Sequence, residues 1–324
     1  MRAFSLLGTV KSAVFSVFSV FSVFSVSLVM SFPLMSQCIG VVTAGGGDGF
    51  WGEVKKGAET AGRELSVKVL VRGAADEVDS KSQAKIIHSM MAIGCEALVL
   101  APNNSNRNKE VKSLKEKGIS TVFIDRDTGG ERVSVIKTDN FKAGYLAGLE
   151  MASALAGSNN KRVVLLRMDQ KVISTRLREE GFIKAAKEKG LNLIFEGYLG
   201  TTIGQARVNS IRFLKGLGEF EGVFTPNEST SVSVLASLKQ LGLEQDVKFI
   251  GFDSHTLMIK AVQEKSMQGF IIQNPFLMGY QGVKTAHAAR LGKTIDASVE
   301  AEVIFVDASN IKQKKIQEML GLKD

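Results

Sequence analysis

The chain has 324 residues, of which 44% are hydrophobic and 23% are charged, and its formal net charge at pH 7 is +8. This composition excludes a disordered chain, because enough apolar residues are present to build large cores, and the length suits two lobes of ordinary size. The positive charge does not indicate nucleic-acid binding, because the lysines alternate with glutamates at helical spacing in segments such as "KSLKEKG" and "KAAKEKG".

The first 37 residues differ from the rest of the chain. After Arg2 and Lys11 no charged residue appears before Asp48, and the apolar run "AVFSVFSVFSVFSVSLVM" lies in this gap. A basic start followed by an apolar run is typical of an export signal, so residues 1–37 are predicted to be a signal peptide or a membrane-directed segment. The run is also long enough for an uncleaved anchor, and Cys38, a few residues after it, is a possible lipidation site. The expected location is the periplasm or the cell surface.

The two cysteines open two strand-like runs. Cys38 begins "CIGVVTAG" and Cys95 begins "CEALVLAP". In a doubly wound sheet the first and third strands are neighbours, so a disulfide between Cys38 and Cys95 is possible in an oxidising compartment. The alternative is a pair of buried thiols.

Beyond the N-terminal segment, strand-like and helix-like segments alternate in two series. The first contains the runs "IGVVTA", "VKVLVRG", "ALVLAP", "STVFID" and "VSVIKTD", with helices predicted near 50–65, 79–93 and 107–117. The second contains "RVVLLRM", "LNLIFEG", "GVFTPN", "VKFIGFD" and "QGFIIQN". Continuous apolar runs of this kind indicate parallel strands that are covered by helices on both faces. The sequence therefore predicts an α/β fold with two similar doubly wound parallel-sheet lobes.

Polar and aromatic residues follow these strands at the point where each strand ends. Examples are "DGFW" after the first strand, "DRD" after the fourth and "NE" after "GVFTP". The carboxyl ends of parallel strands line the binding crevice of such sheets. Carboxylates, amides and arginines can pair with neighbouring hydroxyls, and an aromatic ring can stack on the apolar face of a sugar. The pattern predicts a site for a neutral polyol.

The segment "GDGFWG", residues 47–52, also matches the G-x-G-x-x-G motif of dinucleotide-binding loops. Such a loop presents a bare helix N-terminus to a pyrophosphate. Here Asp48 adds negative charge, and Phe50 and Trp51 place two rings where the phosphates would lie. The motif is therefore interpreted as a tight strand-to-helix turn, and no cofactor is expected.

The chain resembles the periplasmic sugar-binding proteins of ABC importers, most closely the ribose-binding branch of the type I periplasmic binding proteins. The resemblance rests on eight segments in consistent order: "DGFWGEVKKGAE", "MAIGCEALVLAP", "VFIDRD", "TDNFKAG", "RLREEGF", "GVFTPNE", "IGFDS" and "GFIIQN". It implies a three-strand hinge between the lobes with a ligand cleft between them. The implied divisions are 38–138 plus 274–302 for the first lobe, 139–273 plus 303–310 for the second, and 311–324 for a C-terminal tail.

The resemblance also implies a role for individual residues. Asp48 would bond the sugar, Phe50 and Trp51 would pack on its face, and Arg178 is preferred to Arg176 as the ligand arginine. The complete implied sugar-binding set is Asp48, Phe50, Trp51, Asp125, Arg126, Arg178, Asn227, Phe252, Asp253 and Gln273. Two positions depart from the ribose pattern, because Ala101 stands where an asparagine is expected and Thr201 lies near the place of a phenylalanine, with Tyr198 as a possible substitute.

The implied function is capture of a monosaccharide, which can be a ribose-like pentose, a hexose or a related polyol, and its delivery to an ABC transporter permease. The alternative is a membrane-anchored sugar sensor that signals to a chemoreceptor or kinase partner. A monomer is expected, with no catalytic residues, no metal and no nucleic-acid partner. His88, His255 and His287 stand singly, without a second ligand at metal spacing. For Asn227 and Asp253 a purely local role as helix caps is the competing interpretation.

Overall fold

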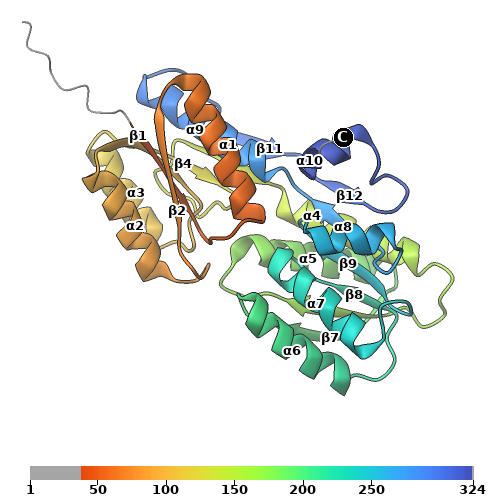
Figure 1. Ribbon diagram of the computed structural model, residues 1–324. Helices are drawn as coiled ribbons and strands as arrows, with labels where there is room; N and C mark the ends of the chain where they lie inside the picture. Colours follow the sequence, from red (N-terminus) through yellow and green to blue (C-terminus); the bar gives the residue numbers. More distant parts are fainter. Residues whose placement is uncertain (1–37, 323–324) are drawn as a thin grey trace, which may run out of the picture. The chain divides into compact units, whose positions relative to one another are not determined.

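The structure is a computed structural model that describes residues 38–322 (Figure 1). These residues belong to one compact unit. The segment 1–37, predicted to be a signal peptide or membrane-directed segment, lies outside the described residues. Within residues 38–322 no helix combines the length and the apolar character that a membrane span requires.

The first sheet contains the N-terminal strands and one strand from near the C-terminus. Its order is β11-β5-β4-β3-β1-β2, and all neighbours are parallel. The strands are β1 (Cys38–Thr43), β2 (Lys68–Gly73), β3 (Cys95–Leu100), β4 (Ser120–Ile124), β5 (Ser134–Thr138) and β11 (Ser298–Ala301). The central strands β1, β3 and β4 are almost completely buried, as continuous apolar runs under two helix layers should be.

The second sheet repeats this order with the next strands of the chain. Its order is β12-β10-β9-β8-β6-β7, and only β12 is antiparallel to its neighbour β10. The strands are β6 (Arg162–Arg167), β7 (Asn192–Tyr198), β8 (Gly222–Phe224), β9 (Lys248–Phe252), β10 (Gly269–Ile272) and β12 (Ile304–Val306). The prediction of two similar α/β lobes with parallel sheets is confirmed.

Helices cover the two sheets. Those of the first lobe are α1 (Phe50–Leu65), α2 (Ser80–Ala92), α3 (Arg107–Glu116) and α9 (Pro275–Arg290). Those of the second are α4 (Asn140–Ala154), α5 (Ile173–Glu188), α6 (Ile203–Gly216), α7 (Glu228–Leu241), α8 (Thr256–Gln263) and α10 (Lys314–Met319). Helices α4 and α5 approach closely at Gly144, where an added Cβ would lie 1.8 Å from the carbonyl oxygen of Arg178. This contact fixes the backbone that carries Arg178.

The chain passes between the sheets at three places. It leaves the first sheet after β5, returns after β10 through Gln273 and Asn274, and passes again from β11 to β12. The segment after β12 packs on the second lobe, because Ile311 and Ile316 are 1% and 2% exposed within its apolar core. Within the tail 311–324 that the resemblance implies, these two residues therefore belong to the core of the second lobe.

A disulfide joins Cys38 and Cys95. Their sulfurs are 2.17 Å apart, and the two residues are partners in the register of β1 and β3. Both side chains are buried. Because the Cys38 sulfur is engaged in this bond, it is not available for lipidation in this structure.

Candidate functional site

The main cavity lies where the strands of both lobes end. Its volume is about 920 Å³, and it is lined by residues that follow β1, β4, β8, β9 and β10. Nine of the ten predicted sugar-binding residues line it: Asp48, Phe50, Trp51, Asp125, Arg126, Arg178, Asn227, Asp253 and Gln273. The rule that parallel strands end at one edge predicted a site at these strand ends, and the family resemblance supplied the individual residues.

The remaining residue, Phe252, is fully buried and does not line the cavity. Its ring lies beneath Arg178, whose guanidinium carbon is 3.9 Å from the ring centroid. Phe252 is the last residue of β9, and alternate side chains of a strand point to opposite faces, so its ring enters the second-lobe core. Its contact with the site is through the arginine it supports.

Two aspartates occupy equivalent positions in the two lobes. Asp125 follows β4 and Asp253 follows β9, and both have left-handed backbone angles, with φ of 63° and 64°. Each donates its backbone N–H to the strand beside it, at Ile136 and Ile271 respectively. A positive φ is unusual for a residue with a side chain, and such positions cluster at binding sites. Each lobe therefore directs one buried carboxylate into the cavity from the same position of its sheet.

Burial affects both carboxylates. It raises the pKa of Asp125, although Arg126 and Arg178 oppose the shift. It raises the pKa of Asp253 to about 6, again against the influence of Arg178. Asp253 is held on both oxygens, because Gln273 donates to Oδ1 at 2.7 Å and the Glu228 backbone N–H donates to Oδ2 at 3.2 Å.

Arg126 is the most enclosed cation of the first lobe, with 3% exposure. Its Nε lies 2.9 Å from Asp125 Oδ2 and 3.2 Å from Ser174 Oγ, which belongs to the second lobe. Its Nη2 is paired with the Glu77 carboxylate. Nη1 is buried and has no protein partner in the described part of the chain. Burial alone would lower the pKa of Arg126, but the neighbouring carboxylates of Glu77 and Asp125 raise it by more. The net shift of the pKa is upward, so the guanidinium stays charged.

Arg178 is fixed by the second lobe. Its Nε donates to Asn140 Oδ1 at 2.7 Å, and its Nη1 donates to the Pro226 carbonyl at 2.9 Å. Arg176, by contrast, is exposed and lies 3.6 Å from Glu180 Oε1. The placement agrees with the preference for Arg178, because helix α5 turns Arg178 toward the cavity and Arg176 toward solvent.

Asn227 and Gln273 hold structural roles as well. Asn227 caps helix α7, where its Oδ1 accepts from the Thr230 N–H at 3.3 Å and from the Thr230 hydroxyl at 2.6 Å. Gln273 Oε1 accepts from the Thr138 hydroxyl at 2.8 Å, so it connects two of the three chain crossings. The local interpretation of Asn227 as a cap and its position in the cavity lining are both correct.

The first-lobe loop supplies the aromatic side of the cavity. Phe50 is half-buried and meets Trp51 edge-on, with ring centroids 4.8 Å apart. Trp51 is 8% exposed, and its Nε1 donates to Glu77 at 3.0 Å. Asp48 is exposed at the cavity edge. The Trp51 ring is thus a nearly buried wall rather than an open stacking surface.

Three glutamates of the lining, Glu53 of α1, Glu77 and Glu228, lie outside the implied sugar-binding set. Glu77 lies in the loop between β2 and α2, and Glu228 is the first residue of α7. Glu228 Oε2 accepts the backbone N–H of Phe50 from across the cavity at 2.9 Å. Burial raises the pKa of Glu228, and the charge of Glu77 adds to the shift. The motif "GVFTPNE" contained Glu228, so its position after a strand was an available signal; Glu77 had none.

The two residues that depart from the ribose pattern, Ala101 and Thr201, differ in whether they line the cavity. Ala101 is fully buried and lies outside the lining, whereas Thr201 lines the cavity. Tyr198 does not line it, and its hydroxyl accepts from Arg167 instead. Ile203, which is 53% exposed, lines the cavity near Thr201 and presents an apolar side chain there.

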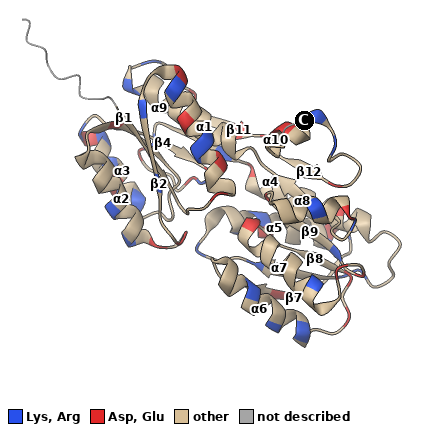
Figure 2. Cartoon of the chain, in the orientation of Figure 1, with Lys and Arg blue, Asp and Glu red and all other residues tan. Residues whose placement is uncertain are grey.

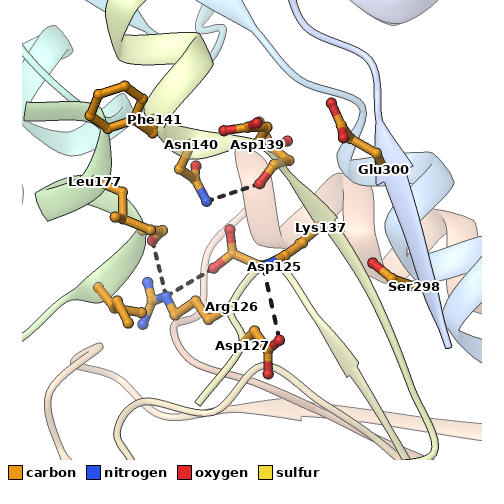
Figure 3. A pocket seen from close by; sticks show the side chains of 13 residues that line it. Asp125, Arg126, Asp127, Lys137, Asp139, Asn140, Phe141, Leu177, Ser298 and Glu300 are labelled. Carbon is orange, nitrogen blue, oxygen red and sulfur yellow. Dashed lines mark hydrogen bonds and ion pairs between the residues drawn. The ribbon is translucent and has the colours of Figure 1, made fainter. Parts of the chain in front are cut away.

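A smaller cavity of about 240 Å³ lies on the other side of Arg126 (Figure 3). Asp125, Arg126 and Ser174 line both cavities. Figure 3 shows Arg126 between Leu177 of α5 and the Asp125 carboxylate. The bond from Arg126 to Ser174 therefore forms part of the partition between the two spaces.

The histidines do not form a metal site. His255 caps α8 through its Nδ1 and lines the main cavity, and His287 lies on α9. Burial lowers the pKa of both. Among residues 38–322 no group of three or more histidine, cysteine or acidic residues is arranged to hold a metal ion.

Comparison with known proteins identifies the family. The model of the periplasmic binding protein domain matches residues 39–294. The ribose import binding protein RbsB of Bacillus subtilis is 25% identical over 265 residues, which are 78% of this chain and 83% of that protein.

Solved structures similar to this chain point to the same family. The periplasmic component of an ABC-type sugar transport system from Hahella chejuensis is 31% identical, with a TM-score of 0.79, and the match covers 83% of this chain and 99% of that one. A carbohydrate transporter solute-binding protein from Agrobacterium radiobacter, in complex with D-arabinose, is 26% identical with a TM-score of 0.83, and the match covers 89% and 99%. The chain belongs to the periplasmic binding protein family, in the group related to ribose-binding proteins.

Proposed function

We propose that the chain is an extracytoplasmic solute-binding protein that captures a monosaccharide and delivers it to the permease of an ABC importer. The observation that carries this proposal is the convergence of buried Asp, Arg, Asn and Gln side chains from both lobes on one cavity with an aromatic wall. Such side chains match the alternating donors and acceptors of a polyol. The relatives named above include ribose-binding and arabinose-bound proteins.

Capture requires that the ligand bind the closed form more tightly than the open form. Two contacts cross between the lobes beside the cavity, from Phe50 to Glu228 and from Arg126 to Ser174. A sugar seated between Asp125 and Asp253 would add bonds to both lobes at once. Bending at the three crossings would then close the lobes around it, and the closed form would dock on the permease.

The proposal is tested through Trp51, the only tryptophan of the chain. Titration of the purified protein with D-ribose, D-allose, D-arabinose, D-galactose and myo-inositol should change its intrinsic fluorescence for at least one sugar. The same sugar should raise the unfolding temperature, because a ligand at 100 times its Kd adds about 2.7 kcal/mol of stability.

A matched variant separates the signal from the binding. W51F should lose the fluorescence response but keep thermal stabilisation by the same sugar at higher concentration. If no sugar alters either fluorescence or unfolding temperature, while NADH does, the proposed function is wrong.

A further inference from the structure

We propose that Glu77 is a positioning residue of the sugar site, which holds the Trp51 ring and the Arg126 guanidinium in place and leaves one Arg126 donor for the ligand. This inference rests on the proposed function. It concerns a residue that no motif of the sequence indicated. Its two carboxylate oxygens serve two different site residues, since Oε1 accepts from Trp51 Nε1 at 3.0 Å and Oε2 pairs with Arg126 Nη2.

The loop that carries Glu77 is held by local hydrogen bonds. Asp76 Oδ1 accepts the Val78 N–H at 3.1 Å, and Asp79 caps α2 by accepting from Lys81 and Ser82. Between these anchors the Glu77 side chain extends into the main cavity, where it is 18% exposed. The carboxylate is thus presented by a fixed backbone rather than by a freely moving loop.

The Trp51 ring can reach Glu77 only because residue 45 is glycine. A Cβ at Gly45 would lie 2.7 Å from Trp51 Nε1 and 3.0 Å from Glu77 Cγ. Its backbone angle is not in the left-handed region, so an alanine there would be disfavoured by this contact alone. The close approach of loop 44–49, Trp51 and Glu77 is therefore built into the packing.

The consequence for binding concerns the donors of Arg126. Nε is used by Asp125 and Ser174, and Nη2 is used by Glu77. Nη1 of Arg126 remains: it is buried, and no residue among 38–322 accepts a hydrogen bond from it. A buried donor without a partner costs free energy. A ligand oxygen that accepts a hydrogen bond from Nη1 removes that cost, and this strengthens binding. Glu77 determines which donor that is, since without it Nη2 would also be free and the guanidinium could rotate.

The experiment compares E77Q and E77A with the wild type by calorimetric titration of the sugar that binds best. Both variants should bind about 10- to 100-fold more weakly, because a charged hydrogen-bond partner is lost. E219Q, which removes an exposed carboxylate that does not line the cavity, should bind as the wild type does. The ligand-free emission of Trp51 should shift to longer wavelength in E77A, because its indole N–H would then bond to water.

A double variant with Arg126 tests whether Glu77 positions that arginine or has only a general structural role. If Glu77 acts through Arg126, the affinity losses of E77A and R126K should not multiply in the double variant, because both remove the same arrangement. The inference would be overturned if the two losses of affinity multiply in the double variant. It would also be overturned if E77Q and E77A bind within twofold of the wild type, or if the Trp51 emission of E77A is unchanged.

The isosteric E77Q and the unfolding temperatures of all variants guard against misfolding as the cause. If the wild type binds no sugar, the proposed function fails, and the Trp51 emission of E77A still decides whether Glu77 holds the ring.

Discussion

At the scale of single residues, the structure contains buried charges whose cost depends on pH. Glu179 of α5 has no exposed side-chain area, and its carboxylate lies 3.5 Å from Arg167 Nε and accepts the Met168 N–H at 3.3 Å. Burial raises the pKa of Glu179 from 4.5 to about 7, although Arg167 opposes the shift. The folded state therefore holds this proton more tightly than the unfolded state does.

The sign of the effect follows from proton linkage. Between about pH 4.5 and pH 7 the folded state binds more protons, so the free energy of unfolding falls as the pH rises through this window. The isosteric E179Q removes the cost and should raise the free energy of unfolding by up to about 3 kcal/mol at pH 8, with little difference near pH 4.5. Thermal unfolding across this range checks it. E219Q, at an exposed glutamate of the same lobe, is the control variant, and an E179Q profile parallel to the wild type would contradict the assignment.

At the scale of elements, the C-terminal segment is part of the second lobe. Ile311 and Ile316 are buried against its core, and Met319, Leu320 and Leu322 pack beside them. Met319 to Leu322 also line the main cavity. Helix α10 is only six residues long and would not be stable alone, so tertiary packing must hold it.

The variant I316A tests this placement. Removing a buried isoleucine side chain should lower the free energy of unfolding by about 2–5 kcal/mol, because transfer energy is lost and a cavity forms. V208A, at a valine of α6 that is 68% exposed, should change it by no more than about 0.5 kcal/mol. Chemical denaturation measures both. Equal effects of the two substitutions would mean that the segment does not pack on the lobe in solution.

At the scale of the whole molecule, charges are distributed differently on the surface and in the cavity. Figure 2 shows basic and acidic residues interspersed along the outer helices, where pairs such as Lys184 and Glu188 lie one turn apart. Among the described residues that line the main cavity, carboxylates outnumber cations: Asp48, Glu53, Glu77, Asp125, Glu228 and Asp253 face Lys56, Arg126 and Arg178. The cavity should therefore prefer neutral ligands to anionic ones.

This preference is measurable with matched sugars. D-galacturonate should bind at least about tenfold more weakly than D-galactose, because one unpaired carboxylate at roughly 8 Å repels it by about 2 kcal/mol at an effective dielectric of 20. Titration calorimetry at low salt tests this, and E228Q should narrow the difference in affinity between the two sugars by removing one carboxylate from the cavity lining. Tighter binding of the uronate would contradict the charge argument.

Sequence patterns alone predicted the two lobes and which strand ends line the cavity. Continuous apolar runs separated by helical segments are a local property, and the parallel strands they predict must end at a common edge. The strand-end rule therefore predicted correctly that Asp125, Asp253 and Gln273 lie in one cavity. The same rule could not show that Phe252 turns into the core, because the facing of one side chain depends on the local register.

The three-dimensional fold was needed to show which residues from distant loops meet, and which buried polar atoms of the described residues have no hydrogen-bond partner. Glu77 and Arg126 are 49 positions apart, and Phe50 and Glu228 are 178 apart, with no periodicity or spacing to connect them. The packing of residues 311–322 likewise depends on apolar surface supplied by other segments. Local patterns specify elements and strand ends, whereas the pairing of side chains across the cavity depends on how the two lobes fold together.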